Sequence, residues 1–400
     1  MIEGAADFGN MAKPFCEFAE ASMCNVVKSV ILAVAFLTIV ATSEATPKSK
    51  IAKPVGSIVK ETVATYSPTS VVIAHRGASY DAPEETVPAY VLARDWGADY
   101  LEADIQRTKD GVLICLHDDK LNRTTDISDK FPKRAEDPVS TFTWAELSTL
   151  DAGSWFNKKY PDRARKEFVG LKIVTLDELI TIAESGDNRP GIYLETKEAS
   201  QFPGIEKDIA NLLKKRNWIG AVKNPPEIKG SVKVGLTQAR VIMQTFVPDS
   251  LKLLHQEMPM VPAIFLLWVD GGTLKSTTPD SKRGMLETFA KYAARLKIEP
   301  TEFEKWLKFA KDSGAVGIGP SSSATALADQ SYFDLVQPWM NEMAHKMGLF
   351  VHAYTVDDAG DMQKFSTQGV DGFFTNRPDV GLTFYGRSSK LTKDEIWKTE

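Results

Sequence analysis

The fold is decided by a short apolar run that ends abruptly in polar residues, Val71-Val72-Ile73-Ala74-His75-Arg76-Gly77. An unbroken apolar run of this length predicts a strand, Val71–His75, that is buried on both faces. Seven similar runs follow, and longer stretches separate them. They are Tyr100–Gln106, Gly191–Thr196, Arg240–Phe246, Val261–Trp268, Ala315–Gly319, Leu349–Thr355 and Gly372–Thr375.

Stretches with helical periodicity lie between these strands. They are Thr86–Trp96, Leu176–Glu184, Ile205–Lys215, Glu302–Ser313 and Leu335–Met347. Strands that alternate with helices predict parallel strands joined by crossover helices. Eight such units between residues 70 and 385 predict an α/β fold, a closed (β/α)8 or TIM barrel. A doubly wound open sheet is the main alternative.

Two segments depart from the alternation. Val112–His117 follows a turn at Lys109-Asp110-Gly111, which predicts a hairpin partner for the second strand. Residues 118–171 are rich in charged and aromatic residues and are too long for a simple loop. We predict that they form a small inserted subdomain at one end of the barrel domain, residues 70–385. Residues 386–400 are expected to form a polar C-terminal tail.

The N-terminal region has the three parts of a secretory signal. The apolar run Val30–Ala41 follows Lys28, and the small residues Ser43 and Ala45 come after it. This pattern predicts a cleaved signal peptide, so residues 1–45 would be an N-terminal extension and signal. The apolar run is shorter than the ~20 residues that span a bilayer, so no stable span is expected after cleavage. A buried helix and an uncleaved anchor are the alternatives.

A cleaved signal predicts a secreted or periplasmic protein. The polar, acidic stretch before Met23 suggests that Met23 is the true start, and residues 46–69 are expected to be an extended lead-in. Cys16 and Cys24 precede the predicted cleavage point, so only Cys115 would remain and no internal disulfide could form. A domain of this size has a core large enough to need none.

The composition is that of an ordinary globular protein. The chain has 400 residues, of which 43% are hydrophobic and 25% charged, and a formal net charge of −5. No basic run is interleaved with aromatic residues, which argues against nucleic acid as a partner. A single buried arginine or lysine could still bind a small phosphate.

Ionisable residues collect at the carboxyl ends of the first strands, where a barrel places its active site. His75 and Arg76 end the first strand, and arginine offers a fork of donors that suits phosphate. Glu102 and Asp104 lie two apart on the second strand and therefore point the same way. Neighbouring anions repel each other unless a cation lies between them, and a hard divalent cation, Ca2+ or Mg2+, prefers oxygen ligands.

The same pattern continues on the next two strands. His117 ends the hairpin strand, and Glu195 and Lys197 share one face at the end of the strand after it. The set supplies three carboxylates for a metal, two histidines for proton transfer, and an arginine and a lysine for a phosphate. These groups together indicate phosphodiester cleavage, in which two protons move and negative charge grows on the phosphoryl oxygens.

These motifs resemble the signature of the glycerophosphodiester phosphodiesterase (GDPD) family. The matching segments are His75-Arg76-Gly77-Ala78, Pro83-Glu84-Glu85-Thr86, Glu102-Ala103-Asp104, His117-Asp118 and Glu195-Thr196-Lys197. Three later segments resemble the longer periplasmic, GlpQ-type members in particular. They are Gly317–Pro320, Val351–Val356 and Asp371–Thr375.

The resemblance implies a (β/α)8 barrel with an inserted subdomain. It also implies hydrolysis of a small glycerophosphodiester to glycerol 3-phosphate and an alcohol such as choline or ethanolamine. Glu102, Asp104 and Glu195 would bind the divalent cation, Ca2+ or Mg2+. His75 and His117 would be the acid–base pair. As a mechanistic hypothesis we take His117 as acid, His75 as base and a cyclic phosphate as intermediate, although the sequence leaves open which histidine is the acid.

The resemblance gives further residues a role in binding the substrate. Arg76 and Lys197 would hold the phosphate, Glu84 would order the loop near the metal or a phosphate ligand, and Tyr354 would line the glycerol side of the pocket. The chain departs from the usual family pattern in two places. Glu85 replaces the usual Asn, which would alter metal affinity, and Tyr354 replaces the usual Trp.

Two other functions fit parts of this pattern. A phosphodiesterase on the same barrel could act on lysophospholipids or sphingomyelin, as phospholipase D toxins do. Those proteins usually carry an internal disulfide, which Cys115 alone could not form. A binding protein without turnover would lack a metal carboxylate or a histidine, and this chain lacks neither. The sequence leaves the oligomeric state open.

Overall fold

The computed structural model describes residues 70–219, 241–269, 273–275, 298–322 and 335–398. The predicted signal peptide at 1–45, the lead-in at 46–69, and Cys16 and Cys24 lie outside these ranges. The described residues fall within one compact unit of the chain. Among them, no helix has both the length and the apolar character needed to cross a membrane.

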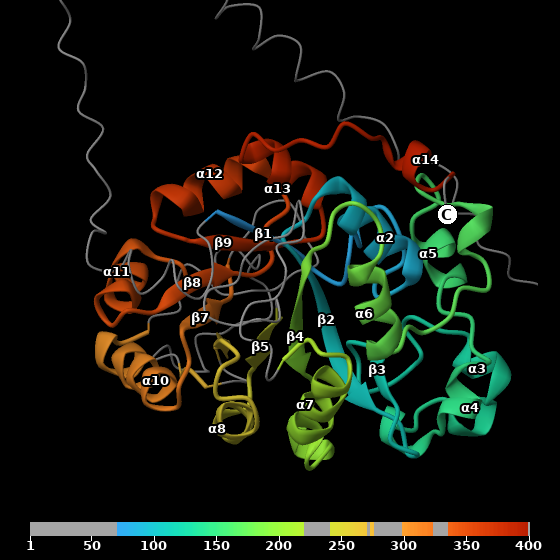
Figure 1. Ribbon diagram of the computed structural model, residues 1–400, viewed down its shortest axis with the longest axis horizontal. Coiled ribbons are helices and arrows are strands. Elements are labelled where there is room, and N and C mark those ends of the chain that lie inside the picture. Colours follow the sequence, from blue (N-terminus) through green and yellow to red (C-terminus); the bar gives the residue numbers. More distant parts are fainter. Residues whose placement is uncertain (1–69, 220–240, 270–272, 276–297, 323–334, 399–400) are drawn as a thin grey trace, which may run out of the picture. The chain divides into compact units, whose positions relative to one another are not determined.

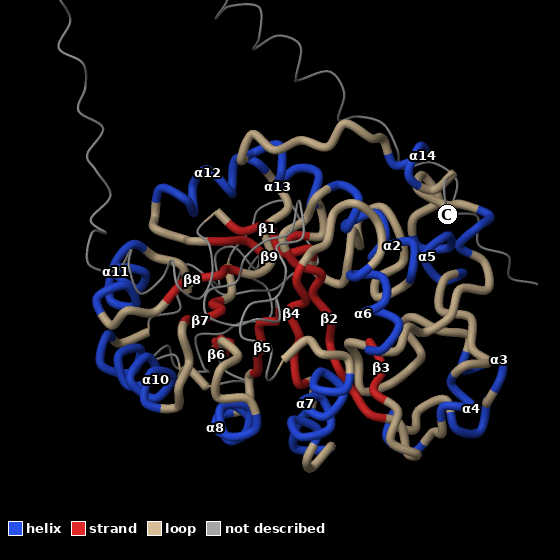
Figure 2. Tube along the Cα trace, viewed as in Figure 1, coloured by secondary structure: helices blue, strands red, loops and turns tan. Residues whose placement is uncertain are grey.

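Eight parallel strands close into a barrel (Figures 1 and 2). They are β1 (Val71–Ala74), β2 (Tyr100–Arg107), β4 (Gly191–Thr196), β5 (Val241–Thr245), β6 (Ala263–Leu267), β7 (Gly317–Pro320), β8 (Phe350–Ala353) and β9 (Gly372–Thr375). Strands that are adjacent in the barrel follow one another in the sequence. The barrel closes because β1 pairs with β2 on one side and with β9 on the other. This closure confirms the (β/α)8 prediction and rules out the open doubly wound sheet.

Helices surround the barrel (Figure 1). The main ones are α2 (Val87–Trp96), α6 (Leu176–Glu184), α7 (Ile205–Lys215), α8 (Pro248–Glu257), α10 (Pro300–Asp312), α11 (Pro338–Lys346), α12 (Ala359–Thr367) and α13 (Pro378–Phe384). Helix α6 begins where Thr175 and Glu178 form a reciprocal capping box. Helix α11 was predicted from Leu335 but begins at Pro338, because proline favours the first helical position and an extended residue before it.

The strands divide their side chains between two apolar cores. On β1, Val71 and Ile73 point into the barrel, whereas Val72 and Ala74 pack against the surrounding helices. The inner core also contains Tyr100 from β2. Because strand side chains alternate, the inward-pointing positions continue beyond this core towards the carboxyl ends of the strands. The barrel thus directs every second residue there towards one central pocket.

The hairpin prediction is confirmed, because β3 (Leu113–Cys115) pairs antiparallel with β2. The chain then forms short helices, including α3 (Ile127–Lys130), α4 (Trp144–Leu147) and α5 (Ser154–Lys159). They have apolar clusters of their own, centred on side chains such as Phe142 and Phe156. Figure 1 shows this segment beside the barrel. The domain boundaries at 70–385 and 118–171 stay predictions.

The C-terminal residues pack against this inserted segment. Helix α14 (Lys393–Ile396) brings Asp394 to Arg165, at 2.6 Å, and Trp397 against Phe168, with ring centres 5.6 Å apart. Ile396 is buried. The predicted polar tail therefore carries an anchored helix at residues 393–396. Cys115 is buried and has no disulfide partner among the described residues.

Candidate active site

Three carboxylates meet at the carboxyl ends of β2 and β4. One oxygen from each of Glu102, Asp104 and Glu195 lies within 4.8 Å of the others. Asp104 and Glu195 are partners in the parallel ladder, and Glu102 is two residues earlier on the same face. All three are at most 6% exposed. Such a cluster of hard oxygen donors fits a divalent cation, and Oδ2 of Asp104 is buried there without a hydrogen bond, with the charge of Arg76 beside it.

The cluster carries an electrostatic cost that a cation would relieve. Burial, and then the charge of Asp104, raises the pKa of Glu102 well above its usual value. Burial also raises the pKa of Glu195 to about 7. Burial opposes ionisation of Asp104 too, but Lys197 and other positive neighbours outweigh it and hold the pKa of Asp104 below its usual range. The three groups therefore do not all ionise readily without additional positive charge.

Two cationic side chains border the carboxylates. Nζ of Lys197 lies 3.1 Å from Oε1 of Glu195 and 3.5 Å from Oδ1 of Asp104. Nε of Arg76 lies 3.1 Å from Oδ2 of Asp104. Arg76 has a left-handed backbone, with φ of 58°, and its N–H donates to Glu102 at 2.8 Å. The turn after β1 thus directs both the amide and the guanidinium of Arg76 towards the cluster.

The two predicted histidines are each held through Nδ1. His75 Nδ1 lies 2.8 Å from Oδ1 of Asn376, and His117 Nδ1 lies 2.6 Å from Oδ1 of Asp118. Both partners accept, so Nδ1 donates and Nε2 is left for the pocket. Burial, and then the charge of Arg76, lowers the pKa of His75 to about 3. Burial also lowers the pKa of His117. Nε2 of His75 is thus a free acceptor, and His117 can act as an acid only when Nε2 is protonated opposite the Asp118 carboxylate.

Most of the predicted site residues line one pocket, whose other side is apolar. The lining consists of His75, Arg76, Glu102, Asp104, His117, Glu195, Lys197, Gln244, Phe246, Leu266, Trp268, Tyr354 and Phe374. The ring centres of Tyr354 and Phe246 are 5.9 Å apart, and the Tyr354 hydroxyl donates to the carbonyl of Leu267 at 2.8 Å. Glu84 is not in this lining. It accepts a hydrogen bond from Nη1 of Arg76 at 2.9 Å and so lies behind the pocket wall.

The chain that forms this site is similar to a known family of proteins. The model of the glycerophosphoryl diester phosphodiesterase family matches residues 75–380. The chain belongs to this family. A glycerophosphodiester phosphodiesterase of Bacillus subtilis is 33% identical over 310 residues, which are 78% of this chain and 84% of the relative. One from Caldanaerobacter subterraneus is 29% identical over 78% of this chain and 96% of its own length.

Solved structures agree on the fold. A phosphodiesterase from Oleispira antarctica aligns with a TM-score of 0.54 at 22% identity, over 80% of this chain and 97% of that one. A structure described as a glycerophosphoryl diester phosphodiesterase from Silicibacter pomeroyi also aligns with a TM-score of 0.54. It is 21% identical, and the alignment covers 80% of this chain and 95% of that one. The chain is thus an enzyme, a glycerophosphodiester phosphodiesterase on the TIM barrel of its family.

The site of this phosphodiesterase contains residues that the sequence analysis missed. Gln244 donates to Oε1 of Glu102 at 3.1 Å, and Asn376 holds His75. Both could have been found, because Gln244 alternates with Ile242 on a predicted strand and Asn376 directly follows another. Arg123 contacts Glu84 and Asp118 from the inserted segment. No periodic pattern marks that position.

Glu85 is buried next to Asp104. It is 4% exposed, and its Oε1 accepts the backbone N–H of Asp104 at 2.8 Å. Burial, and then the charge of Asp104, raises the pKa of Glu85 well above its usual value. Glu85 therefore supports the backbone of one predicted metal ligand and lies outside the cluster of three carboxylates.

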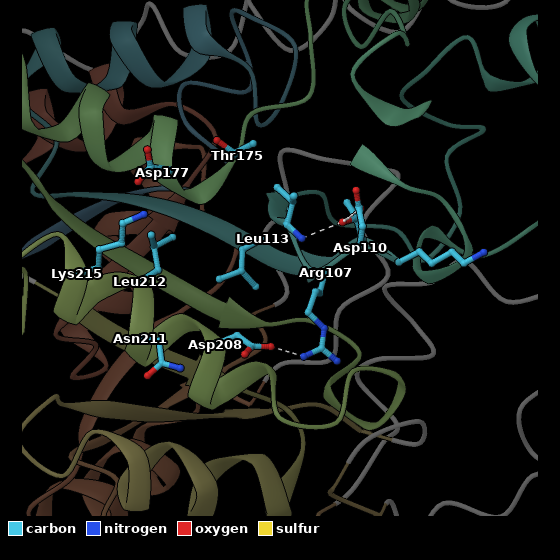
Figure 3. Close-up of a pocket in the computed structure, with 13 residues that line it drawn as sticks. Arg107, Asp110, Leu113, Thr175, Asp177, Asp208, Asn211, Leu212 and Lys215 are labelled. Atoms are coloured by element: carbon cyan, nitrogen blue, oxygen red, sulfur yellow. Dashed lines mark hydrogen bonds and ion pairs between the residues drawn. The ribbon is translucent and has the colours of Figure 1, made fainter. Parts of the chain in front are cut away.

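Two other features of the phosphodiesterase are separate from this pocket. His352 is fully buried in the barrel, where its Nδ1 lies 3.2 Å from the Tyr193 hydroxyl. A groove of about 710 Å³ lies on the outer surface, between the β2–β3 hairpin and helix α7, where Arg107 and Asp208 form an ion pair (Figure 3). None of the groove's lining residues belongs to the predicted site.

Proposed function

We propose that the enzyme hydrolyses small glycerophosphodiesters, such as glycerophosphocholine or glycerophosphoethanolamine, to glycerol 3-phosphate and an alcohol. The observation that carries this proposal is the pocket itself. It joins three carboxylates, two histidines and two cationic side chains at the carboxyl end of one barrel. The Oleispira antarctica structure contains the product sn-glycerol-3-phosphate, which supports the same product here.

The charge of the pocket supports a divalent cation, Ca2+ or Mg2+, at Glu102, Asp104 and Glu195. With all three carboxylates ionised and Arg76 and Lys197 protonated, the pocket lining carries a net charge of −1. A divalent cation together with a phosphodiester monoanion would bring the occupied pocket to neutrality. Bound there, the cation supplies a Lewis acid that polarises a phosphoryl oxygen.

The remaining residues bind and orient the substrate. Arg76 and Lys197 are placed to hold the other phosphoryl oxygens, and Glu84 fixes the Arg76 guanidinium from behind. Tyr354 and Phe246 offer an apolar wall for the glycerol carbons. The substrate would then lie with its phosphate against the charged side of the pocket and its glycerol against the aromatic side.

The partners of the two histidines support opposite roles in proton transfer. Asp118 is a carboxylate and stabilises a protonated His117, whereas Asn376 is neutral and leaves Nε2 of His75 as a base. His75 takes the proton from the glycerol hydroxyl beside the phosphate, and that oxygen attacks phosphorus. His117 donates a proton to the departing alcohol, giving a cyclic phosphate. The roles then reverse as water opens the ring.

Coupled assays for released glycerol 3-phosphate and for released choline test the function, because a lysophospholipase D frees choline from lysophosphatidylcholine without releasing glycerol 3-phosphate. The substrates are glycerophosphocholine, glycerophosphoethanolamine and lysophosphatidylcholine, each with and without a chelator. We expect release from the first two, loss of activity with chelator, and recovery when Ca2+ or Mg2+ is returned. Hydrolysis of lysophosphatidylcholine alone would overturn the proposal in favour of a lysophospholipase D.

We propose further that the protein is secreted or periplasmic, like the GlpQ-type members it resembles. The support is the basic start, short apolar run Val30–Ala41 and small residues up to Ala45. Expression of the full sequence followed by mass measurement of the exported protein tests this. We expect a mature N-terminus directly after Ala45; an uncleaved protein inside the cell would contradict it.

A further inference from the structure

Arg123, in the inserted segment, contacts two side chains that each support a different pocket residue. We propose that Arg123 is a positioning residue of the active site: it fixes Asp118 behind His117 and Glu84 behind Arg76. The inserted segment thereby sets the proton donor and the phosphate-binding guanidinium in one arrangement. This inference rests on the function proposed above.

The first half of the arrangement concerns His117. Nδ1 of His117 lies 2.6 Å from Oδ1 of Asp118. Arg123 donates from Nε to Oδ2 of Asp118 at 2.5 Å and from Nη2 to Oδ1 at 3.0 Å. Both carboxylate oxygens are therefore held, and the plane of the carboxylate is fixed. An imidazole bonded to a fixed carboxylate has its tautomer and its ring orientation set.

The second half concerns Arg76. Arg123 donates from Nη1 to Oε2 of Glu84 at 2.7 Å and from Nη2 to Oε1 at 2.8 Å, a two-pronged ion pair. Oε1 of Glu84 also accepts from Nη1 of Arg76 at 2.9 Å. Arg76 in turn approaches Asp104 in the carboxylate cluster. A continuous series of contacts thus runs from His117 through Arg123 to the predicted metal ligands.

The geometry requires an arginine at this position. The guanidinium uses Nε, Nη1 and Nη2 in one plane to bind two carboxylates at once. A lysine would keep the positive charge but could not hold both carboxylates in the same plane. The Arg123 side chain is 37% exposed, so it can be replaced with little disturbance of packing.

The backbone of His117 does not depend on Arg123. Nε2 of Gln106, a fully buried residue on β2, donates to the carbonyls of Leu116 and Asp118, both at 2.7 Å. These bonds fix the chain on either side of His117. Loss of Arg123 is therefore expected to leave the fold and the His117 backbone in place and to release only the side chains. This distinguishes a positioning role from a purely structural one.

The test compares Arg123→Gln with Arg134→Gln. Arg134 lies in the same segment, is 34% exposed, and binds Asp137 and Glu146 away from the pocket. The two substrates are glycerophosphocholine and the 4-nitrophenyl ester of glycerol phosphate, whose leaving group needs little protonation. For Arg123→Gln we expect kcat on glycerophosphocholine to fall about 10- to 100-fold. We expect a smaller fall on the nitrophenyl ester, and a higher KM for both because Arg76 is less well oriented.

The controls keep the inference separate from the proposed function. Arg134→Gln should match the wild type in kcat and KM, and Arg123→Lys, which keeps the charge, should recover part of the lost activity. Arg123→Gln with wild-type kinetics, or with equal losses on both substrates and an unchanged KM, would overturn the positioning role. A wild-type enzyme that releases no glycerol 3-phosphate would instead refute the proposed function.

Discussion

The two histidines of the pocket differ mainly in what their Nδ1 atoms contact. His75 is bonded to the amide of Asn376, and His117 to the carboxylate of Asp118. A carboxylate partner favours the protonated imidazole, and an amide does not. The different roles proposed for the two rings therefore come from residues outside the pocket lining.

His117→Ala tests the assigned proton donor. We expect kcat on glycerophosphocholine to fall by about 10²- to 10⁴-fold, because the departing alcohol is no longer protonated. The thermal unfolding midpoint should change little, since Gln106 holds the backbone on both sides of this residue. Near-normal turnover would show that His117 is not an essential acid.

Glu85 provides a prediction for a buried residue that supports a predicted metal ligand. Burial, and then the charge of Asp104, raises the pKa of Glu85 well above its usual value, so an uncharged amide is a close substitute for its carboxyl. Glu85→Gln keeps an oxygen for the N–H of Asp104, so metal affinity should change by less than about threefold. Glu85→Ala removes that acceptor and should weaken metal binding about 10-fold. Calorimetric titration of both variants with the metal ion measures this difference. Equal metal affinities of Glu85→Gln and Glu85→Ala would contradict the role given to Glu85.

Among single residues, the sequence predicted the clustered carboxylates that lie on strands. Glu102, Asp104 and Glu195 could be predicted because strand periodicity places them on one face. Arg123 could not, because its contacts depend on how the irregular segment 118–171 folds against the loop after β1. Such contacts between segments distant in sequence leave no periodic signal in either one.

The turn after β1 is the element on which the site depends most. Gly77 has φ of +83°, and a Cβ there would lie 2.7 Å from the backbone carbon of Ala89 in α2. Only glycine fits both the backbone conformation and the close approach of the helix. This turn also carries His75 and Arg76, so its shape determines where both side chains point.

Gly77→Ala tests the importance of this turn. We expect a loss of about 2 kcal/mol in the free energy of unfolding, together with reduced activity, because the turn must move away from α2. Gly111→Ala is the matched control: its φ is +92°, but a Cβ there has no atom within 4 Å. Urea unfolding of both variants measures the difference. Equal losses would mean that contact with α2 is unimportant.

Elements with strong local signals were predicted well. All eight barrel strands and the hairpin strand appear where short, mainly apolar runs predicted them. The start of α11 was placed too early because the apolar residues Leu335 and Val336 continue the helical pattern. They are buried, but they precede Pro338, which sets the first turn. Burial and helix formation are separate properties, and periodicity alone does not distinguish them.

At the scale of the whole molecule, an ion pair far from the pocket links α11 to the sheet. Nε2 of His345 lies 2.9 Å from Oδ2 of Asp371, which also accepts the N–H of Val351 at the start of β8. Burial opposes protonation of His345, but the hydrogen bond and charge of Asp371 outweigh it and raise its pKa above 6.5. A raised histidine pKa stabilises the fold below pH 6.5, and this contribution is lost as pH rises through the folded-state pKa.

His345→Gln should therefore remove a pH-dependent part of the stability. We expect the variant to be less stable than the wild type by about 1 kcal/mol at pH 6, and the gap to narrow as pH rises towards 9. Thermal unfolding across this pH range measures the gap. A constant gap would show that the charge on His345 does not contribute.

The central claim is that Glu102, Asp104 and Glu195 together bind one divalent cation. Isothermal titration of chelator-treated enzyme with Ca2+, and separately with Mg2+, tests this claim most directly. We predict that at least one of the two ions binds the wild type with one ion per chain, and that Asp104→Asn binds it at least about 10-fold more weakly. A wild type that binds neither ion, or an Asp104→Asn variant that binds as tightly as the wild type, would contradict the account.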